Sequence, residues 1–479
     1  MQAGPSFQDL LQRALAAERA LLGSRAASGD RVLSLALPVQ GLDPLAALPR
    51  LAPQEPFRVL WDGAPGLSLA AAGRVQHLEL SGPRRFELAQ RFADLALGRL
   101  CWERADLPPQ ARPRVLLAFA FFSEPGTGEG VPGVQAVLPR WQLSRQGRAG
   151  WLRLQSPLDG RRSARHLAEE LWEMAARLEA GGPEVAGSRE ERASVMAPQR
   201  LGGADALWQQ EYLQAVKRAL ELVEDGSLHK LVLAVRRSLT IPGGLHPLGL
   251  LERLRRQQAG SCRFLWQRHR GDAFFGASPE RLLTVRQGLL RSDALAGTAR
   301  AGDPGEALLR SEKDRREHAL VVDTITDLLR QQQLQPRCPR RPRLARHGSL
   351  VHLHTPITAA ISGRSPLSLA EVLHPTPAVA GLPRRAAMDW LRTLEPFERG
   401  HYAAPIGWID GEGDAELRVA IRSGHLRGDQ LELCAGAGLV RGSVVERELQ
   451  EVAMKLAVLT RGDEGAQPAP RSVSSRAIT

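Results

Sequence analysis

The sequence predicts an α+β fold with mainly antiparallel sheets. Short β-rich runs, separated by Gly, Pro and Asp turns, occur in groups, and helical stretches lie between the groups. Of the 479 residues, 43% are hydrophobic and 24% are charged, which is the composition of a globular protein. No run approaches the ~18 apolar residues of a membrane-spanning helix, and the start of the chain is amphipathic and charged. We therefore expect a cytoplasmic protein without a membrane partner.

The first half is predicted to be rich in strands. Residues 1–23 predict one helix, and residues 163–180 predict another. Between these helices, alternating or continuous apolar runs predict strands at 31–39, 57–63, 75–82, 114–122, 133–145 and 151–157. Residues 179–205 are polar and glycine-rich, with little periodicity, and predict a linker or mobile loop.

The second half repeats the alternation of strands and helices. Helices are expected at 206–225, 311–329 and 444–460, and strands at 230–241, 262–268, 281–293, 350–361 and within 404–440. The composition of the tail, residues 463–479, predicts disorder.

The helix predicted at 311–329 has an unusual buried face. At about 100° per residue, Val321, Ile325 and Leu328 fall on one side. Asp314 and Glu317 fall in the middle of the same stripe. An uncompensated buried carboxylate costs several kcal/mol, so these two side chains require a metal, another cation or a proton.

The last helix shows a related pattern. Its apolar stripe consists of Val445, Leu449, Val452, Leu456 and Leu459. Glu448, Glu451 and Lys455 form a second stripe, rotated from the first by roughly 85–90°. This stripe would stand at the edge of the buried face. The alternative is an ordinary surface pair of Glu451 with Lys455 at i, i+4.

Charge and cysteine content exclude some classes of site. The formal net charge of +12 could indicate nucleic-acid binding, but the arginines are spread along the chain, and a positive field equally attracts a small anionic substrate. The four cysteines, Cys101, Cys262, Cys338 and Cys434, are far apart and form no CxxC motif, which argues against zinc and a disulfide framework.

Several short phrases occur in a distinctive order over residues 206–460. They are "HKLVLA", "GASPE", "ALAGT", "SEKDRREH", "HPTPAVAG", "GWID", "AIRSG", "AGAGLVRGS" and "ERELQEVAMK". Singly, each is weak, but together the set resembles the chorismate-utilising enzymes, which include isochorismate, salicylate, anthranilate and aminodeoxychorismate synthases. The resemblance implies an anthranilate synthase-like fold, with two packed β-sheets and helices outside. It also implies a division into an N-terminal β-rich half (1–200), a chorismate-binding catalytic half (201–462) and the tail.

The resemblance assigns a role to the acidic stripes. It implies a Mg²⁺ ion, held by Glu317, Glu448 and Glu451, that binds the ring carboxylate of the substrate, with Asp314 just beside the site. A hard cation of this kind prefers carboxylates, waters and substrate oxygens, and it would neutralise carboxylates that the helix pattern places inward.

The same resemblance implies a general base and a general acid. Lys230 of "HKLVLA" matches the base that activates water, and Glu280 of "GASPE" matches the acid. A lysine normally titrates near 10.4, so the base role requires a lowered pKa. Glu280 must hold a proton at neutral pH, which requires a raised pKa. The alternative for Lys230 is a lysine at a strand end that reaches solvent.

The remaining matches line the substrate. Arg422 and Tyr402 match groups that hold the pyruvyl carboxylate, and Arg suits a bidentate contact of this kind. The other expected binding residues are Gly297, Thr298, His352, Gly436, Gly438 and Lys455. His352 could equally be a strand histidine whose ring nitrogens are satisfied locally, and Lys455 could simply pair with Glu451.

Within the family, the phrases favour isochorismate synthase of the menaquinone or siderophore type. Ala296 stands where aminodeoxychorismate synthases carry a lysine, and "HPTPAVAG" differs from the anthranilate and salicylate branches. The expected reaction is the Mg²⁺-dependent conversion of chorismate to isochorismate by a monomer or homodimer. The alternatives are a salicylate synthase, which also eliminates pyruvate, and a basic nucleic-acid-binding protein.

Overall fold

The computed structural model describes residues 6–23, 32–63, 66–101, 107–124, 126, 130–158, 162–181, 204–241, 245–302, 305–361 and 363–460. Most of the loop expected at 179–205, and all of the tail expected at 463–479, lie outside these residues. Within them, no helix is long and apolar enough to cross a membrane.

The strands alternate with helices along the chain, as expected. The strands are β1 (Val32–Gln40), β2 (Arg58–Asp62), β3 (Ser68–Leu80), β4 (Leu100–Cys101), β5 (Arg114–Phe119), β6 (Val134–Gln146), β7 (Ala149–Pro157), β8 (Lys230–Thr240), β9 (Cys262–His269), β10 (Asp272–Ser278), β11 (Arg281–Arg286), β12 (Leu289–Arg300), β13 (Arg343–His347), β14 (Leu350–Ala360), β15 (Gly381–Leu382), β16 (Pro405–Asp410), β17 (Ala415–Val419), β18 (Ser423–Arg427) and β19 (Gln430–Leu439). The helices are α1 (Phe7–Gly23), α2 (Pro44–Ala47), α3 (Arg85–Gly98), the 3-10 turn η1 (Pro109–Ala111), α4 (Ala164–Glu179), α6 (Ala204–Glu224), α7 (Pro247–Gln257), α8 (Gly305–Arg310), α9 (Glu312–Gln331), α10 (Pro366–Leu373), α11 (Arg384–Leu394) and α12 (Val445–Thr460).

The two expected sheets are two arms of one connected sheet, joined at the long strand β6. One edge of β6 pairs with β3, which begins the first arm, in the order β3, β2, β9, β10, β18, β19, β8, β15. The other edge pairs with β5, which begins the second arm, in the order β5, β16, β17, β11, β12, β14, β13. Further along β6, this same edge pairs with β7. The strand pairings within both arms are antiparallel, and the pairing of β1 with β4 is parallel. The α+β, mainly antiparallel fold is thus confirmed.

Both arms mix strands from the two halves of the sequence. In the first arm β2 pairs with β9, and in the second arm β5 pairs with β16. The backbone hydrogen bonds of the N-terminal half are therefore completed by strands from the C-terminal half.

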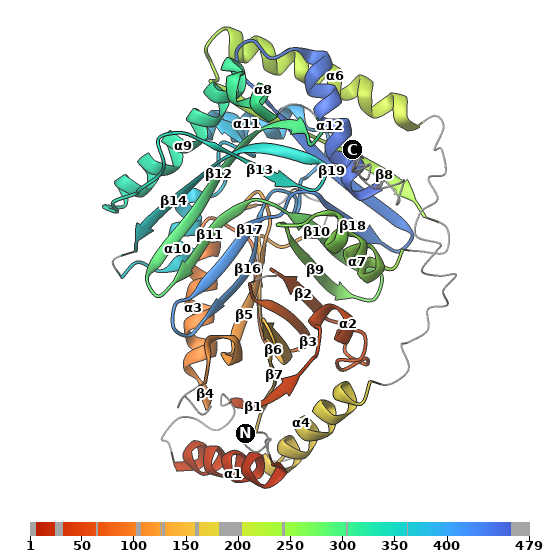
Figure 1. Ribbon diagram of the computed structural model, residues 1–479, viewed down its shortest axis with the longest axis vertical. Helices are drawn as coiled ribbons and strands as arrows, with labels where there is room; N and C mark the ends of the chain where they lie inside the picture. Colours follow the sequence, from red (N-terminus) through yellow and green to blue (C-terminus); the bar gives the residue numbers. More distant parts are fainter. Residues whose placement is uncertain are drawn as a thin grey trace, which may run out of the picture.

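Aromatic side chains fill part of the space between the arms. Trp61 and Trp266 from the first arm pack in one buried cluster with Trp408 from the second, and Phe57 meets Trp266 edge to face with centroids 5.3 Å apart. Helices cover the outside of the sheet. Figure 1 shows α1 and α4 at one end of the molecule, and α6, α9, α11 and α12 at the other. This second end holds the candidate site.

Several elements differ from the expectation, because helices α3, α7, α10 and α11 and strands β10 and β13 were not expected. Helix α3 was missed because its buried residues at Phe86, Ala89, Ala93 and Ala96 are mostly alanines. Alanine is only weakly hydrophobic, so its helical spacing does not stand out from the residues between. The strand expected at 281–293 is a hairpin of β11 and β12. Gln287 and Gly288 form its turn, both with positive φ. A glutamine is not the usual first residue of such a two-residue turn, so the sequence carried no clear turn signal there.

Candidate active site

The predicted site residues gather around a narrow cavity of about 70 Å³ where the two arms diverge. Strands β8 and β19 of the first arm form one side, and β12 and β14 of the second arm form the other. Helices α9 and α12 pack on β12 and β19 respectively. Eleven of the predicted residues line the cavity: Glu280, Gly297, Thr298, Glu317, His352, Tyr402, Arg422, Gly436, Gly438, Glu451 and Lys455. Ala296 lines it as well.

Lys230 lies directly behind this lining. It is the first residue of β8 and is fully buried, so it does not reach solvent as a strand-end lysine would. Its Nζ lies 2.8 Å from Oε1 of Glu317. A Cβ at Gly438, on the neighbouring strand β19, would collide with the Glu317 carboxylate. The glycine of "AGAG" therefore makes room for this ion pair.

A second lysine joins the acidic residues of the two helices. Lys313 on α9 places Nζ 2.8 Å from Oε1 of Glu448 on α12 and 3.9 Å from Oε2 of Glu317. Burial alone would raise the pKa of Glu317, but the charges of Lys230 and Lys313 outweigh it and hold the pKa below its usual value. For Glu448, burial and the nearby Glu451 carboxylate prevail over Lys313 and raise the pKa.

Asp314 lies at the edge of this cluster. Its side chain is half-buried, whereas Glu317, one turn further along α9, is almost completely buried. Burial raises the pKa of Asp314. Ser311 caps the helix by accepting a hydrogen bond from the backbone N–H of Asp314. Glu317 therefore points inward, as the helical pattern predicted, while Asp314 stands at the edge of the buried face. Lys230 and Lys313 are the cations that face Glu317.

Glu280 follows β10 and is 3% exposed. Its Oε1 accepts a long hydrogen bond of 3.4 Å from the Thr376 hydroxyl, in the "HPTP" segment. Burial raises the pKa of Glu280 to about 7, although Lys230 and the Thr376 hydrogen bond act in the opposite direction. The raised pKa that the sequence analysis required of this carboxyl is therefore present.

Arg422 and His352 form a connected pair on the cavity wall. His352 Nδ1 lies 2.9 Å from the Gly297 carbonyl oxygen, so this nitrogen carries the proton and donates. Nε2 is then the acceptor, and it faces Nη2 of Arg422. Burial and the Arg422 charge hold the pKa of His352 well below its usual value. Both of its ring nitrogens are satisfied locally, as the alternative interpretation of His352 expected, and its ring also lines the cavity, while its role in substrate binding stays a prediction.

Arg422 itself is held in an uncommon backbone conformation. Its φ is 51°, in the left-handed region that non-glycine residues rarely adopt. Nη1 donates to Gln258 Oε1 at 3.3 Å. Burial lowers the pKa of Arg422 to about 10, and the guanidinium remains charged at neutral pH. Tyr402, also buried, lies on the same cavity, and burial raises its pKa.

A β-bulge shapes the wall formed by β12 and β14. The pairing of β12 with β14 shifts between Ala296 and Thr298, and Gly297 in the bulge has φ of 73°. Thr298 then donates to Glu451 Oε1 at 3.1 Å. The predicted Glu451–Lys455 pair forms at 2.7 Å, at the rim of the cavity, and Lys455 also donates to the Gly436 carbonyl oxygen.

Sequence reasoning missed three contributors. Lys313 lies one turn before Glu317 and so shares its face, a spacing that could have revealed it. Thr376 lies in the quoted phrase "HPTPAVAG" but was not singled out as a site residue. Gln258, which holds Arg422, comes from the end of α7 and left no local signal. Among the residues that the structure describes, no three His, Cys, Asp or Glu side chains stand close enough to share one metal ion.

Comparison with known proteins identifies the family. Residues 15–462 match the family model described as "Chorismate binding enzyme". The chain belongs to this family. It is 34% identical over 311 residues to the isochorismate synthase EntC of Escherichia coli K12, covering 63% of this chain and 78% of that protein.

Other relatives of this chorismate-binding enzyme bear similar names. It is 42% identical over 267 residues to the salicylate biosynthesis isochorismate synthase of Pseudomonas aeruginosa, a match that covers 54% of this chain and 56% of that protein. The chain spans 56% to 61% of the length of the first curated relatives that it matches. The structure of the menaquinone-specific isochorismate synthase MenF from Escherichia coli superposes with a TM-score of 0.71 at 25% identity, over 95% of this chain and 100% of that one.

Proposed function

We propose that this protein is an isochorismate synthase, which converts chorismate to isochorismate. The observation that carries the proposal is Glu280, a buried carboxyl with a pKa of about 7 on the same cavity as Arg422 and Lys455, with Lys230 behind it. A carboxyl of this kind can donate a proton at neutral pH. The names of the relatives support the same reaction.

The proposed chemistry divides between two residues. Lys230 takes a proton from a water molecule, which attacks C2 of the ring. Glu280 protonates the C4 hydroxyl, which leaves as the double bonds shift. Arg422, oriented by His352 and Gln258, binds the pyruvyl carboxylate. The cavity is narrow, so a ring-sized substrate requires side-chain movement at its walls.

The ion pair of Lys230 with Glu317 bears on this assignment. In this pair an ammonium faces a carboxylate 2.8 Å away, and an ammonium has no lone pair with which to take a proton from water. The base role therefore requires that Lys230 first gives up its proton, and its partner Glu317 is also one of the proposed metal ligands. The pair therefore links the base role to the proposed metal site.

The acidic residues of α9 and α12 are of the type that a magnesium ion binds, but as described they do not converge on one point, so binding would require Lys313 to move out from between Glu317 and Glu448. Carboxylate oxygens are the ligands that Mg²⁺ prefers. Glu317 and Glu448 already flank a cation, the Lys313 ammonium, so the space between the helices suits positive charge. We propose that Glu317, Glu448 and Glu451 hold the ion. When bound, it would supply positive charge for the ring carboxylate of chorismate.

Product analysis tests the proposal. The purified protein is incubated with chorismate and Mg²⁺ in ¹⁸O-labelled water, and the products are separated by chromatography. We expect isochorismate labelled at the new C2 hydroxyl, and its formation should stop in excess EDTA. Salicylate and pyruvate released as fast as chorismate is lost would instead assign the chain to the salicylate branch.

A further inference from the structure

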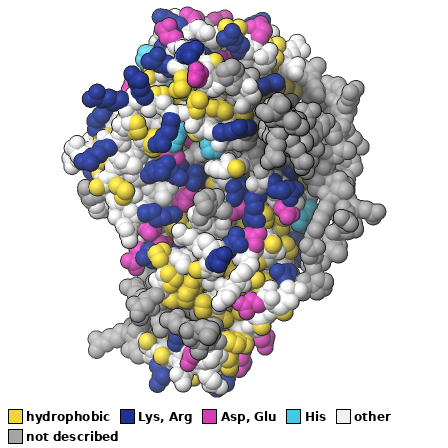
Figure 2. Space-filling model, viewed as in Figure 1, with side chains coloured by type: hydrophobic (Ala, Val, Ile, Leu, Met, Phe, Trp, Pro, Cys, Tyr) yellow, Lys and Arg dark blue, Asp and Glu magenta, His cyan; other side chains and the backbone are white. Residues whose placement is uncertain are grey.

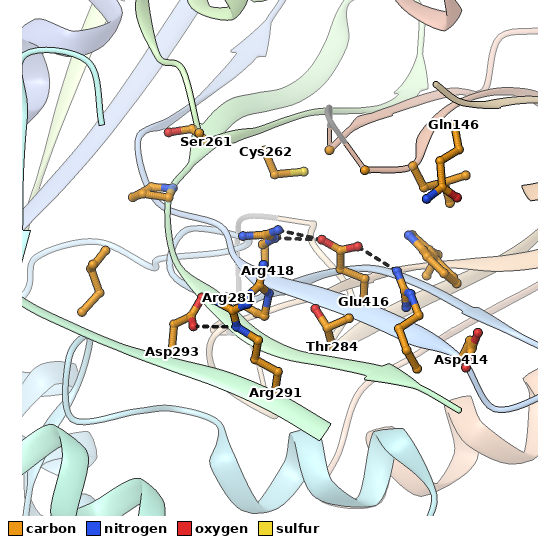
Figure 3. Close-up of a pocket in the computed structure, with 18 of the residues that line it drawn as sticks. Gln146, Ser261, Cys262, Arg281, Thr284, Arg291, Asp293, Asp414, Glu416 and Arg418 are labelled. Atoms are coloured by element: carbon orange, nitrogen blue, oxygen red, sulfur yellow. Dashed lines mark hydrogen bonds and ion pairs between the residues drawn. The ribbon is translucent and has the colours of Figure 1, made fainter. Parts of the chain in front are cut away.

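A second and larger cavity, of about 800 Å³, lies between the two arms. The β2–β3 turn and the start of β9 form one wall, and β11, β12, β16 and β17 form the other (Figure 3). Pro279 and Leu295 separate it from the candidate active site, because both line the two cavities. Apart from these two residues, its lining is different.

Strand alternation explains why this cavity is polar. Along β17, Glu416 and Arg418 point into it, while Leu417 between them packs in the core. Along β12, Arg291 and Asp293 point in, while Ala294 is in the core. Figure 3 shows these side chains converging from neighbouring strands. The inner faces of the two arms thus carry the aromatic cluster in one region and charged side chains in the region of this cavity.

The lining carries more positive than negative charge. Its carboxylates are Asp293, Asp410, Asp414 and Glu416, and its arginines are Arg112, Arg114, Arg281, Arg286, Arg291, Arg346 and Arg418. Each carboxylate already has an arginine partner. Glu416 binds Arg418 and Arg286, and Asp293 binds Arg281 at 2.9 Å and Arg291 at 3.4 Å. Dashed lines in Figure 3 mark ion pairs of Glu416 and Asp293. Arg112 lies 3.4 Å from both Asp410 and Asp414.

Two arginines of this lining, Arg114 and Arg346, pair with no carboxylate among the described residues. The hydrogen bonds of Arg114 go to the backbone carbonyls of Pro109, Gln110 and Arg112. Arg346 donates to the backbone carbonyl of Gly348. Figure 2 shows Lys and Arg side chains, with some acidic ones between them, across the middle of this face. An anion entering the cavity would meet uncompensated positive charge.

Buried polar groups of the same lining also lack partners. Arg114 Nε, Ser261 Oγ and Trp408 Nε1 belong to residues at most 2% exposed, and they make no hydrogen bond within the part of the chain that the structure describes. The buried atoms Arg281 Nε, Thr284 Oγ1 and His347 Nδ1 also make no hydrogen bond there, although their residues are half-buried. Buried polar groups are normally satisfied by protein, water or ligand. Because hydroxyl, guanidinium and indole groups can all donate, they suit a ligand rich in acceptor oxygens.

We propose that this cavity is a second small-molecule site, for an anion with two or more carboxylate or phosphate groups. Arginine forks bind both groups bidentately. The spread of the arginines over several strands favours a ligand with separated charges over a single small ion. This proposal does not depend on the proposed function of the neighbouring site.

Calorimetry on the full chain tests the proposal, with citrate and pyrophosphate as probes in metal-free, low-salt buffer. The rim variant Arg291→Gln/Arg346→Gln removes two charges from exposed or half-exposed side chains, so it should fold normally. We expect saturable binding of at least one probe, weakened about tenfold or more in this variant. Thr284→Val, which removes one unpartnered hydroxyl at nearly constant volume, should also weaken binding. The probe that binds more tightly identifies the preferred acidic group.

Two control variants show whether the probe binds in this cavity or elsewhere on the protein. Arg310→Gln/Arg330→Gln removes two exposed charges from α8 and α9 and should bind the probe as the unmodified protein does. Arg422→Gln alters the candidate active site and should also leave this binding intact. The proposal is overturned if neither probe binds, if the control on α8 and α9 weakens binding equally, or if only Arg422→Gln abolishes it.

Discussion

Glu280 is the residue whose chemistry depends most on its surroundings. An exposed glutamate is ionised at neutral pH, but burial raises the pKa of Glu280 to about 7. A general acid is effective when its pKa lies near the working pH. The same burial means that ionising Glu280 lowers the free energy of unfolding. Its proposed catalytic role and the stability of the fold therefore both depend on whether this carboxyl is protonated.

The first prediction concerns this proton. In its proposed role as general acid Glu280 acts when protonated, so kcat/KM for chorismate should fall as the pH rises through about 7. Glu280→Gln should lower kcat by about 10²–10⁴-fold below pH 7, where Glu280 is protonated, and should not show this fall with pH. The exposed Glu312→Gln is the matched control and should keep both the rate and the pH profile. A profile for the unmodified protein that rises through this range would contradict the role of Glu280 as acid.

The pKa of Glu280 also predicts a dependence of stability on pH. Its folded pKa lies above the unfolded value of 4.5, so its stabilising contribution is complete below pH 4.5 and is lost as the pH rises through about 7. Urea unfolding should therefore show that Glu280→Gln loses less stability than the unmodified protein between these values. Equal slopes for the two proteins would mean that the carboxyl is not buried as described.

The third prediction concerns the buried pair of Lys230 and Glu317. Lys230→Met leaves the Glu317 carboxylate buried with only the more distant Lys313, and breaking such a pair costs about 3–5 kcal/mol. Adding Glu317→Gln removes the stranded charge, so the double variant should regain part of this stability. Urea unfolding measures the recovery, and turnover should stay absent in both variants. If the double variant were less stable than Lys230→Met, the two side chains would not be coupled as an ion pair.

At the scale of elements, the β12 bulge and helix α9 position the site together. Gly297 adopts φ of 73°, and a Cβ there would lie 3.3 Å from Cβ of Asp314 on α9. The bulge lets Thr298 reach Glu451 and lets His352 reach the Gly297 carbonyl. A glycine is needed here for both its conformation and its size.

The fourth prediction follows from this bulge. Gly297→Ala should destabilise the protein by about 1–2 kcal/mol, because alanine is strained at positive φ, and it should weaken chorismate binding. Gly98→Ala at the end of α3 is the matched control, since it has open space and no positive φ. Thermal unfolding and chorismate titration measure the two effects. A Gly297→Ala protein as stable as Gly98→Ala would show that the bulge is not required.

At the scale of the whole molecule, the pairing between halves determines what can fold alone. The partners of β9 and β16 in the first half are β2 and β5. Without residues 1–200, these strands would expose unpaired edges and one side of the aromatic cluster, which favours aggregation.

The fifth prediction is that the complete chain unfolds as one cooperative unit. Urea unfolding followed by tryptophan fluorescence and by far-UV circular dichroism should give coincident transitions. The fragment 204–460, which contains all of the candidate active-site residues, should be insoluble or lack cooperative unfolding. A soluble fragment with its own sharp transition would show that the catalytic half is an independent domain.

The sequence by itself determined the family and the positions of the site residues. Motif order placed Glu280, Arg422 and the glycines of "AGAG" correctly on one cavity, because each motif is a local phrase whose residues keep their spacing in any fold. Helical periodicity likewise indicated that Glu317 is buried, since its position relative to Val321 and Ile325 depends only on 3.6 residues per turn.

Only the tertiary structure decided which cations face the buried carboxylates and how the arms join. Lys230 meets Glu317 across 87 positions of the chain, and Gln258 meets Arg422 across 164. Contacts of this range depend on strand order, which local patterns do not encode. The arginine-lined cavity has the same origin. Its charged residues alternate with apolar residues along each strand, which the sequence shows, but they face one another only after the two arms fold together.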